Sequence, residues 1–259
     1  MLPVKERAGT RHAPAAKIIY LRERSIVMLK NDLIQRNPLR LLGSDSNKSL
    51  GEGEFGAVLA KAGIGKTSVL VQIALDNLLT GKNVLHVSLD QPVRKVCLWY
   101  EEIFNNIARQ YKLTNTTRLW EEILPHRFIM TFNNQAFKVS QFEERVNDLV
   151  EQGIFFPQLI LFDGLPFNEG AREIITELKM VARDLKCPAW ITVRLEAEEN
   201  ITPGVIPESV EDAADLFSTM IGLKTVGKEI DVYLFKGGDP EKASSLAVDP
   251  STLLIKNRD

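Results

Sequence analysis

One glycine-containing segment, residues 60–68 (Ala-Lys-Ala-Gly-Ile-Gly-Lys-Thr-Ser), constrains the fold of this chain more than any other part of the sequence. Gly63 and Gly65 lack a Cβ atom, so the backbone there can adopt positive φ and turn several amide N–H groups toward one anion. Lys66 can reach a terminal phosphate, and Thr67 can offer its hydroxyl group to Mg²⁺. The segment therefore predicts a loop that binds a polyphosphate. The expected binding residues are Ala62, Gly63, Ile64, Gly65, Lys66, Thr67 and Ser68.

The residues on both sides of this loop fit a strand and a helix. Residues 55–59 form a short apolar run that is typical of a buried strand. After the loop, apolar residues recur at helical spacing, and Gly81 stands where a helix would end. The first glycine of the usual phosphate-loop pattern is replaced by Ala60, which is small enough for that position. A chance glycine-rich turn is the alternative, and the strand-loop-helix setting favours the phosphate loop.

A second candidate site, an acidic residue, follows a strand later in the chain. Four apolar residues, 159–162, lead directly to Asp163. Open parallel sheets bind ligands at the carboxyl ends of their strands, so Asp163 is placed to hold the Mg²⁺ that Thr67 also approaches. Taken alone, an aspartate after a buried strand is as well explained as a helix cap or a turn residue. Together with the phosphate loop, it favours a metal-binding role.

Strands and helices are expected to alternate along most of the chain. We expect further strands at residues 83–89, 127–132 and 189–193, and a late hairpin from residues 217–223 and 229–235. This alternation predicts an α/β protein with a mostly parallel central sheet, helices on both of its faces and an antiparallel hairpin near the C-terminus.

Three helices carry clear sequence signals. Pro92 is expected to open one helix, Ser140 and Glu143 have the spacing of a capping box at the start of another, and residues 171–185 form a third. The helix after Pro92 is expected to bury one side through Val93, Val96, Cys97, Tyr100, Ile103, Phe104 and Ile107.

Length and composition allow one large α/β domain, or one domain with an extension. The chain has 259 residues, of which 44% are hydrophobic and 25% are charged. No apolar stretch approaches the ~18 residues that span a membrane, so we expect no membrane association and a cytoplasmic location. The two cysteines, Cys97 and Cys187, belong to no metal-ligand pattern and are expected to be reduced thiols.

Charge is uneven along the chain. Residues 1–50 carry ten Lys and Arg against four Asp and Glu, a net charge of +6, so residues 51–259 carry −8 of the total of −2. We expect a basic N-terminal extension over residues 1–50, with a helix near residues 18–35, followed by one domain over residues 51–259. A basic arm can contact nucleic acid, an acidic partner or a neighbouring subunit, and an ordinary solvated helix explains it equally well.

The order of these elements over residues 51–255 resembles the RecA-like P-loop ATPase fold, particularly its KaiC and DnaB-helicase branch. This resemblance implies a three-layer α/β/α fold, binding of ATP with Mg²⁺, and assembly into a homo-oligomer. It also implies that the strand at residues 189–193 lies between the strand before the phosphate loop and the strand that ends at Asp163.

Three parts of the chain depart from the pattern of that family. Asp90 and Gln91 stand where related proteins have a pair of glutamates that activate water, so Asp90 becomes the expected catalytic base with a side chain one methylene shorter. Arg194 stands near a strand end that commonly carries a glutamine, where it can sense the terminal phosphate or form a surface ion pair with Glu196 or Glu198. The late hairpin ends in Lys236, without the arginine that inserts into a neighbour's site.

The departures lead to a choice among functions. A slow Mg²⁺-dependent ATPase, with Lys66, Asp90 and Arg194 as catalytic residues and with Thr67 and Asp163 as metal ligands, is the leading hypothesis. A nucleotide-binding module with little or no hydrolysis is the first alternative. A DNA-dependent recombinase or helicase is the second, and it depends on the basic N-terminal segment. A GTPase or a small-molecule kinase fits less well, because the sequence lacks the usual guanine-reading element and an arginine-bearing lid.

Overall fold

The structure is a computed structural model that describes residues 50–114, 116–168, 170–196, 199, 201–202, 204–238 and 243–258. Apart from Leu50, the basic extension expected at residues 1–50 lies outside the described residues, and so does its expected helix. None of the described helices is both long and apolar enough to cross a membrane.

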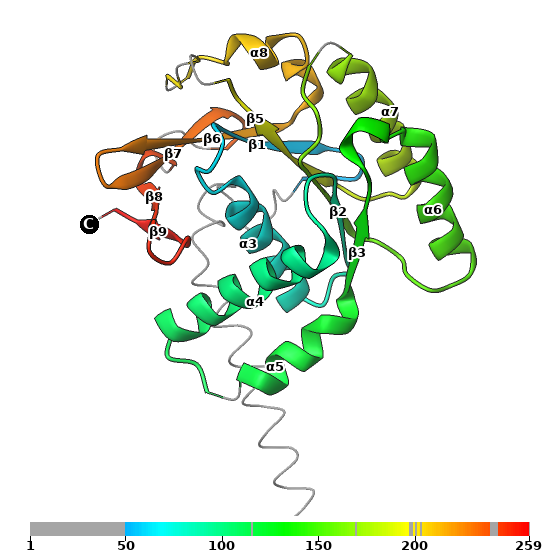
Figure 1. The fold of residues 1–259 in the computed structure, drawn as a ribbon, viewed down its shortest axis with the longest axis horizontal. Coiled ribbons are helices and arrows are strands. Elements are labelled where there is room, and N and C mark those ends of the chain that lie inside the picture. The colour runs from blue at the N-terminus through cyan, green and yellow to red at the C-terminus, as the bar shows by residue number, and fades with distance from the viewer. Residues whose placement is uncertain are drawn as a thin grey trace, which may run out of the picture.

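A nine-stranded sheet runs through the described part of the chain, in the order β3-β2-β4-β5-β1-β6-β7-β8-β9. The strands from β3 to β6 in this order pair in parallel, and β6 to β9 pair antiparallel. The mostly parallel sheet and the late hairpin are therefore confirmed (Figure 1). The strands are β1 Phe55–Ala60, β2 Val84–Ser88, β3 Arg127–Thr131, β4 Leu159–Asp163, β5 Ala189–Arg194, β6 Thr219–Val226, β7 Glu229–Lys236, β8 Leu246–Val248 and β9 Ile255–Asn257.

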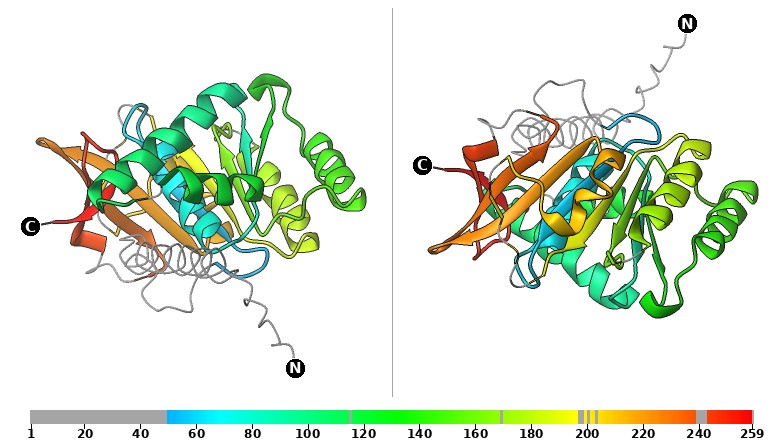
Figure 2. Two further views of the ribbon diagram at one scale, coloured as in Figure 1. Left: turned by 90° about the horizontal axis from the view of Figure 1, so that it is seen from below. Right: turned by 90° about the horizontal axis from the view of Figure 1, so that it is seen from above.

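Helices cover both faces of this sheet. Figure 1 shows α3, α4 and α5 on one side of it and α6, α7 and α8 on the other. Figure 2 shows that β6 to β9 form one end of the molecule, while β3 and α6 lie at the other. The helices are α3 Lys66–Leu79, α4 Val93–Gln110, α5 Thr116–Ile123, α6 Val139–Glu151, α7 Ala171–Asp184 and α8 Glu208–Glu211.

Alternate side chains of the buried strand β1 belong to two hydrophobic cores, one on each face of the sheet. Successive side chains of a strand point to opposite faces of the sheet. Val58 and Ala60 pack with α3 and α4 on one face, whereas Ala57 and Leu59 pack with α6 and α7 on the other. Because both faces are covered, all six residues of β1 are buried, which explains its continuous apolar run.

Two details of the predicted helices are wrong. Val93 is 44% exposed, because the packed face of α4 reaches the core only from Val96 onward. The residue that caps α6 is Lys138, without a side-chain cap, so the predicted capping box of Ser140 and Glu143 is not formed. The helix begins earlier because Val139 is buried with the core residues one and two turns ahead of it.

Two short helices were not predicted. In α5 only Leu119 and Ile123 are buried, a repeat too short to give a clear helical period. The second is α8, a single turn of four residues.

The C-terminal strands are tied to α3 by a buried glutamine. Ten of the fourteen residues of α3 are buried, and Gln72 is among them. Its Nε2 donates to the carbonyl oxygen of Leu253 at 2.9 Å and to that of Ser68 at 3.2 Å. Its Oε1 accepts from the backbone N–H of Ile255 at 2.9 Å. The helix that follows the phosphate loop is therefore fixed to the far end of the chain.

We expect Gln72→Leu to lower the free energy of unfolding by about 1–3 kcal/mol, because it leaves a buried N–H and carbonyl groups without their partner. Denaturant unfolding of the whole chain measures this change. The matched control is Gln141→Leu on the exposed face of α6, where we expect a change within about 0.5 kcal/mol. Equal unfolding midpoints for the two variants would contradict the role assigned to Gln72.

Candidate functional site

The register of the parallel strands brings the predicted site residues to one edge of the sheet. Ser88 at the end of β2 lies opposite Asp163 at the end of β4, and Ala60 at the end of β1 lies opposite Arg194 at the end of β5. The carboxyl ends of these four strands therefore meet. Residues that are more than a hundred positions apart in the sequence become neighbours at this edge.

The predicted phosphate loop has the backbone of an anion-binding nest. Gly63 and Gly65 have φ values of 77° and 101°, in the left-handed region that favours glycine. A Cβ atom on Gly63 would meet no heavy atom within 4 Å, so the space beside this residue is open. Gly65 caps the start of α3 and offers no side chain to the first N–H groups of the helix. These N–H groups and the positive end of the helix dipole are suited to a phosphate.

Lys66 is the first residue of α3, and its side chain folds over the loop. Its Nζ donates to the carbonyl oxygens of Ala60 and Lys61, both at 3.0 Å. Burial lowers the pKa of this ammonium group from its ordinary value, an effect that Asp163 and Asp90 oppose and Arg194 reinforces. The charge of Lys66 is therefore held beside the loop and is sensitive to every charged residue at the edge.

A chain of hydrogen bonds joins the predicted metal-binding residues. Thr67 Oγ1 donates to Asp163 Oδ2 at 2.9 Å. The other carboxylate oxygen, Oδ1, accepts from Thr192 Oγ1 at 2.8 Å, and that hydroxyl oxygen accepts from the backbone N–H of Gly164 at 2.9 Å. Asp163 is only 6% exposed, so its orientation is well defined by these partners.

The side-chain oxygens of Thr67 and Asp163 are of the chemical type that binds Mg²⁺. Magnesium is commonly held through one or two carboxylates together with substrate phosphates and waters, without a cage of protein ligands. The described residues contain no cluster of three or more His, Cys, Asp or Glu side chains that could hold a metal. One carboxylate and one hydroxyl group are therefore a donor set that suits magnesium where its other ligands are phosphates or waters.

Asp90 lies in the short connection between β2 and α4, close to the end of β4. A Cβ atom built on Gly164 would lie 2.4 Å from the Cγ atom of Asp90 and 2.5 Å from its Oδ2, so only glycine permits this approach. Burial raises the pKa of the Asp90 carboxyl group from its ordinary value, and a hydrogen bond from Asn134 Nδ2 at 3.2 Å opposes that change. Lys66 and Arg194 also act on this pKa, which places Asp90 within the electrostatic field of the phosphate loop.

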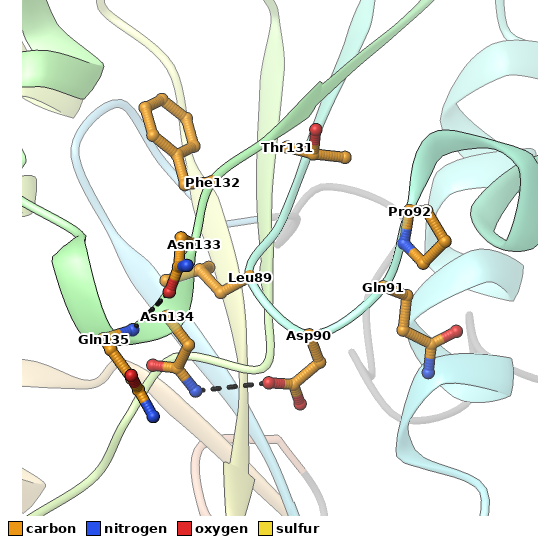
Figure 3. Close-up of a pocket in the computed structure, with 9 residues that line it drawn as sticks. All are labelled: Leu89, Asp90, Gln91, Pro92, Thr131, Phe132, Asn133, Asn134 and Gln135. Atoms are coloured by element: carbon orange, nitrogen blue, oxygen red, sulfur yellow. Dashed lines mark hydrogen bonds between the residues drawn. The ribbon is translucent and has the colours of Figure 1, made fainter.

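A pocket of about 660 Å³ opens beside Asp90, at the carboxyl ends of β2 and β3. Figure 3 shows Asp90 and Asn134 pointing toward each other across it. Its lining contains one carboxylate, four side-chain amides and one threonine, but no lysine or arginine. The lining residues are Leu89, Asp90, Gln91, Pro92, Thr131, Phe132, Asn133, Asn134 and Gln135.

Two predicted cationic residues have different surroundings. Arg194 is exposed at the end of β5, and it forms no ion pair with Glu196, while Glu198 lies outside the described residues. Its guanidinium acts electrostatically on both Lys66 and Asp90, so it lies near the candidate site. Lys236 pairs with Met220 at the opposite end of the sheet, where its Nζ donates to the carbonyl oxygen of Ala214 at 2.9 Å.

Three residues at the edge were missed from the sequence. Thr192 is a polar residue inside an apolar strand, a signal that could have been noticed. Asn134 belongs to a run of three amide residues after β3, which carried no recognised pattern. Gly164 follows Asp163 directly, but its close approach to Asp90 depends on the sheet register and has no local signal.

Comparison with known proteins adds no assignment. The sequence matches no protein-family model, and no curated protein matches it. The functional interpretation therefore depends on the geometry and chemistry of this edge of the sheet.

We expect Thr192→Val to lower the free energy of unfolding by about 1–3 kcal/mol, because it leaves the N–H of Gly164 and one oxygen of Asp163 without their shared partner. Thr192→Ser keeps the hydroxyl group and should lose much less. Denaturant unfolding distinguishes them, and equal losses for the two variants would show that the hydroxyl group does not support Asp163.

Proposed function

We propose that this chain is a Mg²⁺-dependent ATPase of the RecA-like class that hydrolyses ATP slowly. The observation that carries the proposal is the 2.9 Å hydrogen bond between Thr67 and Asp163 beside the positive-φ loop at Gly63 and Gly65. This bond joins the residue after the loop that would bind the phosphates to the carboxylate that would hold the magnesium ion. The position of β5 between β1 and β4, which the resemblance implied, supports the same proposal.

Each residue of the loop has a defined part in ATP binding. The N–H groups around Gly63 to Ser68 would donate to the phosphate oxygens, and the ammonium group of Lys66 would neutralise the terminal phosphates. Thr67 and Asp163 would hold the ion, directly or through water. When bound, Mg²⁺ would neutralise charge that develops on the phosphate oxygens during hydrolysis.

Asp90 is the proposed base for hydrolysis. Its carboxylate would accept a proton from a water molecule as the water oxygen forms a bond to the γ-phosphorus atom. The bond from that phosphorus to the bridging oxygen then breaks, releasing ADP and phosphate. The raised pKa of Asp90 favours this role, since a base works best when its pKa approaches the operating pH.

We expect slow turnover because the late hairpin has no arginine to act as a finger. An arginine finger accelerates hydrolysis by roughly 10³ to 10⁵ in enzymes that have one. The late hairpin continues from Lys236 to Gly237 and Gly238, and the ammonium group of Lys236 is already bonded within its own chain. Besides Lys66, Arg194 would approach a terminal phosphate from within the subunit, since its charge acts on both Lys66 and Asp90. Assembly into a homo-oligomer would add a further cation only if a neighbouring copy supplied one.

The two alternatives differ in what supports them. A nucleotide-binding module without useful hydrolysis requires the same loop, and the shorter side chain of Asp90 favours it. A DNA-dependent ATPase depends on the basic extension at residues 1–50, most of which lies outside the described residues. The pocket beside Asp90 has no lysine or arginine in its lining, which makes it a poor site for a nucleic-acid backbone.

We expect Lys66→Ala to abolish ATP turnover and to weaken nucleotide binding, because it removes the cation that neutralises the terminal phosphates. Phosphate release under multiple-turnover conditions and ATP titration measure the two effects. Lys82→Ala, at the opposite edge of the sheet before β2, is the matched control. Background-level rates and equal nucleotide affinities for wild type and Lys66→Ala would refute the proposal.

We expect Asp90→Asn to lower kcat by roughly 10² to 10⁴, the usual contribution of a general base, with little loss of ATP affinity. Single-turnover hydrolysis, with Mg²⁺ present and the protein in saturating excess over ATP, measures this step. Asp148→Asn on the exposed face of α6 is the control and should hydrolyse ATP as the wild type does. If wild type binds ATP and releases no phosphate over hours, the nucleotide-binding module is the correct alternative.

A further inference from the structure

We propose that Asn134 is a positioning residue that holds the Asp90 carboxylate in the direction needed to accept a proton from water. The proposal rests on the ATPase function proposed above. Its direct evidence is the hydrogen bond from Asn134 Nδ2 to Asp90 Oδ1 at 3.2 Å, which Figure 3 draws. The amide belongs to the loop after β3, whereas Asp90 follows β2, so the bond crosses between two neighbouring strand ends.

The Asp90 carboxyl group has contacts that define its position. Its Oδ2 is the carboxylate oxygen nearer to the position that a Cβ atom on Gly164 would occupy, and its Oδ1 accepts from Asn134. Asp90 itself is exposed and lies outside regular secondary structure. Without Asn134, the glycine contact would restrict how closely the carboxyl group approaches β4, but it would supply no hydrogen bond to orient it.

Asn134 is itself held in a defined turn. It begins a short 3-10 turn, Asn134–Ala136, in which Asn133 Oδ1 accepts from the backbone N–H of Gln135 at 3.0 Å. The start of this loop is fixed to β2, because the N–H of Phe132 donates to the carbonyl oxygen of Ser88 at 3.0 Å. The side-chain amide of Asn134 is therefore held by a hydrogen-bonded turn, and the start of this loop is attached to β2, the strand that precedes Asp90.

Charged groups from three other elements act on Asp90. They are Lys66 at the start of α3, Asp163 at the end of β4 and Arg194 at the end of β5. A hydrogen bond donated to a carboxylate stabilises its charged form. Removing the amide of Asn134 therefore raises the pKa of Asp90 further. Because the proposed base must be deprotonated, the acid side of the pH–rate profile then moves to higher pH.

The neighbouring amide provides a matched control. Gln135 also lines the pocket and is exposed, but its side chain makes no hydrogen bond to Asp90. Asn134→Ala removes both the donor and the bulk, while Asn134→Leu removes the donor and keeps a side chain of similar size. A change in the pKa of Asp90 that both Asn134 variants show, and that Gln135→Ala does not, results from the loss of the hydrogen bond that Asn134 donates.

The first test is independent of hydrolysis. A ¹³C NMR titration of the full chain follows the Asp90 carboxyl carbon, with Asp90→Asn used to identify its signal. We expect the pKa of Asp90 to rise in both Asn134 variants and to stay at the wild-type value in Gln135→Ala. An unchanged pKa in both Asn134 variants would overturn the inference, and thermal unfolding confirms that each variant is folded.

The second test separates positioning from ATP binding. We expect the Asn134 variants to lower kcat roughly 10- to 100-fold with little change in KM for ATP, since hydrolysis is sensitive to a small misplacement of a catalytic group. Gln141→Ala, on the exposed face of α6 and away from the site, should keep both parameters. A changed pKa with an unchanged kcat would overturn the positioning role. Wild-type turnover no higher than that of Lys66→Ala is a different result, which removes the proposed ATPase function and this role with it.

Discussion

The hydrogen bond between Thr67 and Asp163 is the interaction on which the candidate site depends. It connects the helix after the phosphate loop with a strand that is not a neighbour of β1, because β5 lies between them. Thr192 on β5 completes the connection by donating to the other carboxylate oxygen. The first turn of α3 and the strands β4 and β5 are thus joined through one buried carboxylate. A cation held there would lie beside the loop that is suited to its phosphate partners.

This edge of the sheet has two chemically different parts. The part around β1 presents backbone N–H groups and the ammonium group of Lys66, and it is suited to anions. The part at the ends of β2 and β3 presents Asp90 and a group of amides around a pocket without lysine or arginine. Asp90 lies at their boundary, close to Gly164 and bonded to Asn134. Such a division fits the proposed ATPase, in which one side would bind the phosphates and the other would accept the proton.

The sequence predicted the local parts of this arrangement well. The loop at residues 60–68 and the strand ending at Asp163 have short-range signals, namely glycine spacing and a continuous apolar run. The strands of the parallel sheet and the late hairpin were also found from local patterns. The roles of Gly164 and Asn134 could not be predicted, because they arise from strand register over long sequence separations. Thr192 gave only one local signal, that of a polar residue inside an apolar strand. The start of α6 was missed for a related reason, since burial of Val139 outweighed the local capping signal at Ser140.

Isothermal titration calorimetry with ATP tests the central claim most directly, by comparing titrations with Mg²⁺ present and with the metal chelated. The account predicts heat of binding at saturable ATP concentrations and a weaker affinity without the metal, since Thr67 and Asp163 would hold the ion against the phosphates. The absence of any binding heat for ATP, ADP or GTP at millimolar concentrations would contradict it. In that case the glycine-containing loop would be a structural turn between β1 and α3.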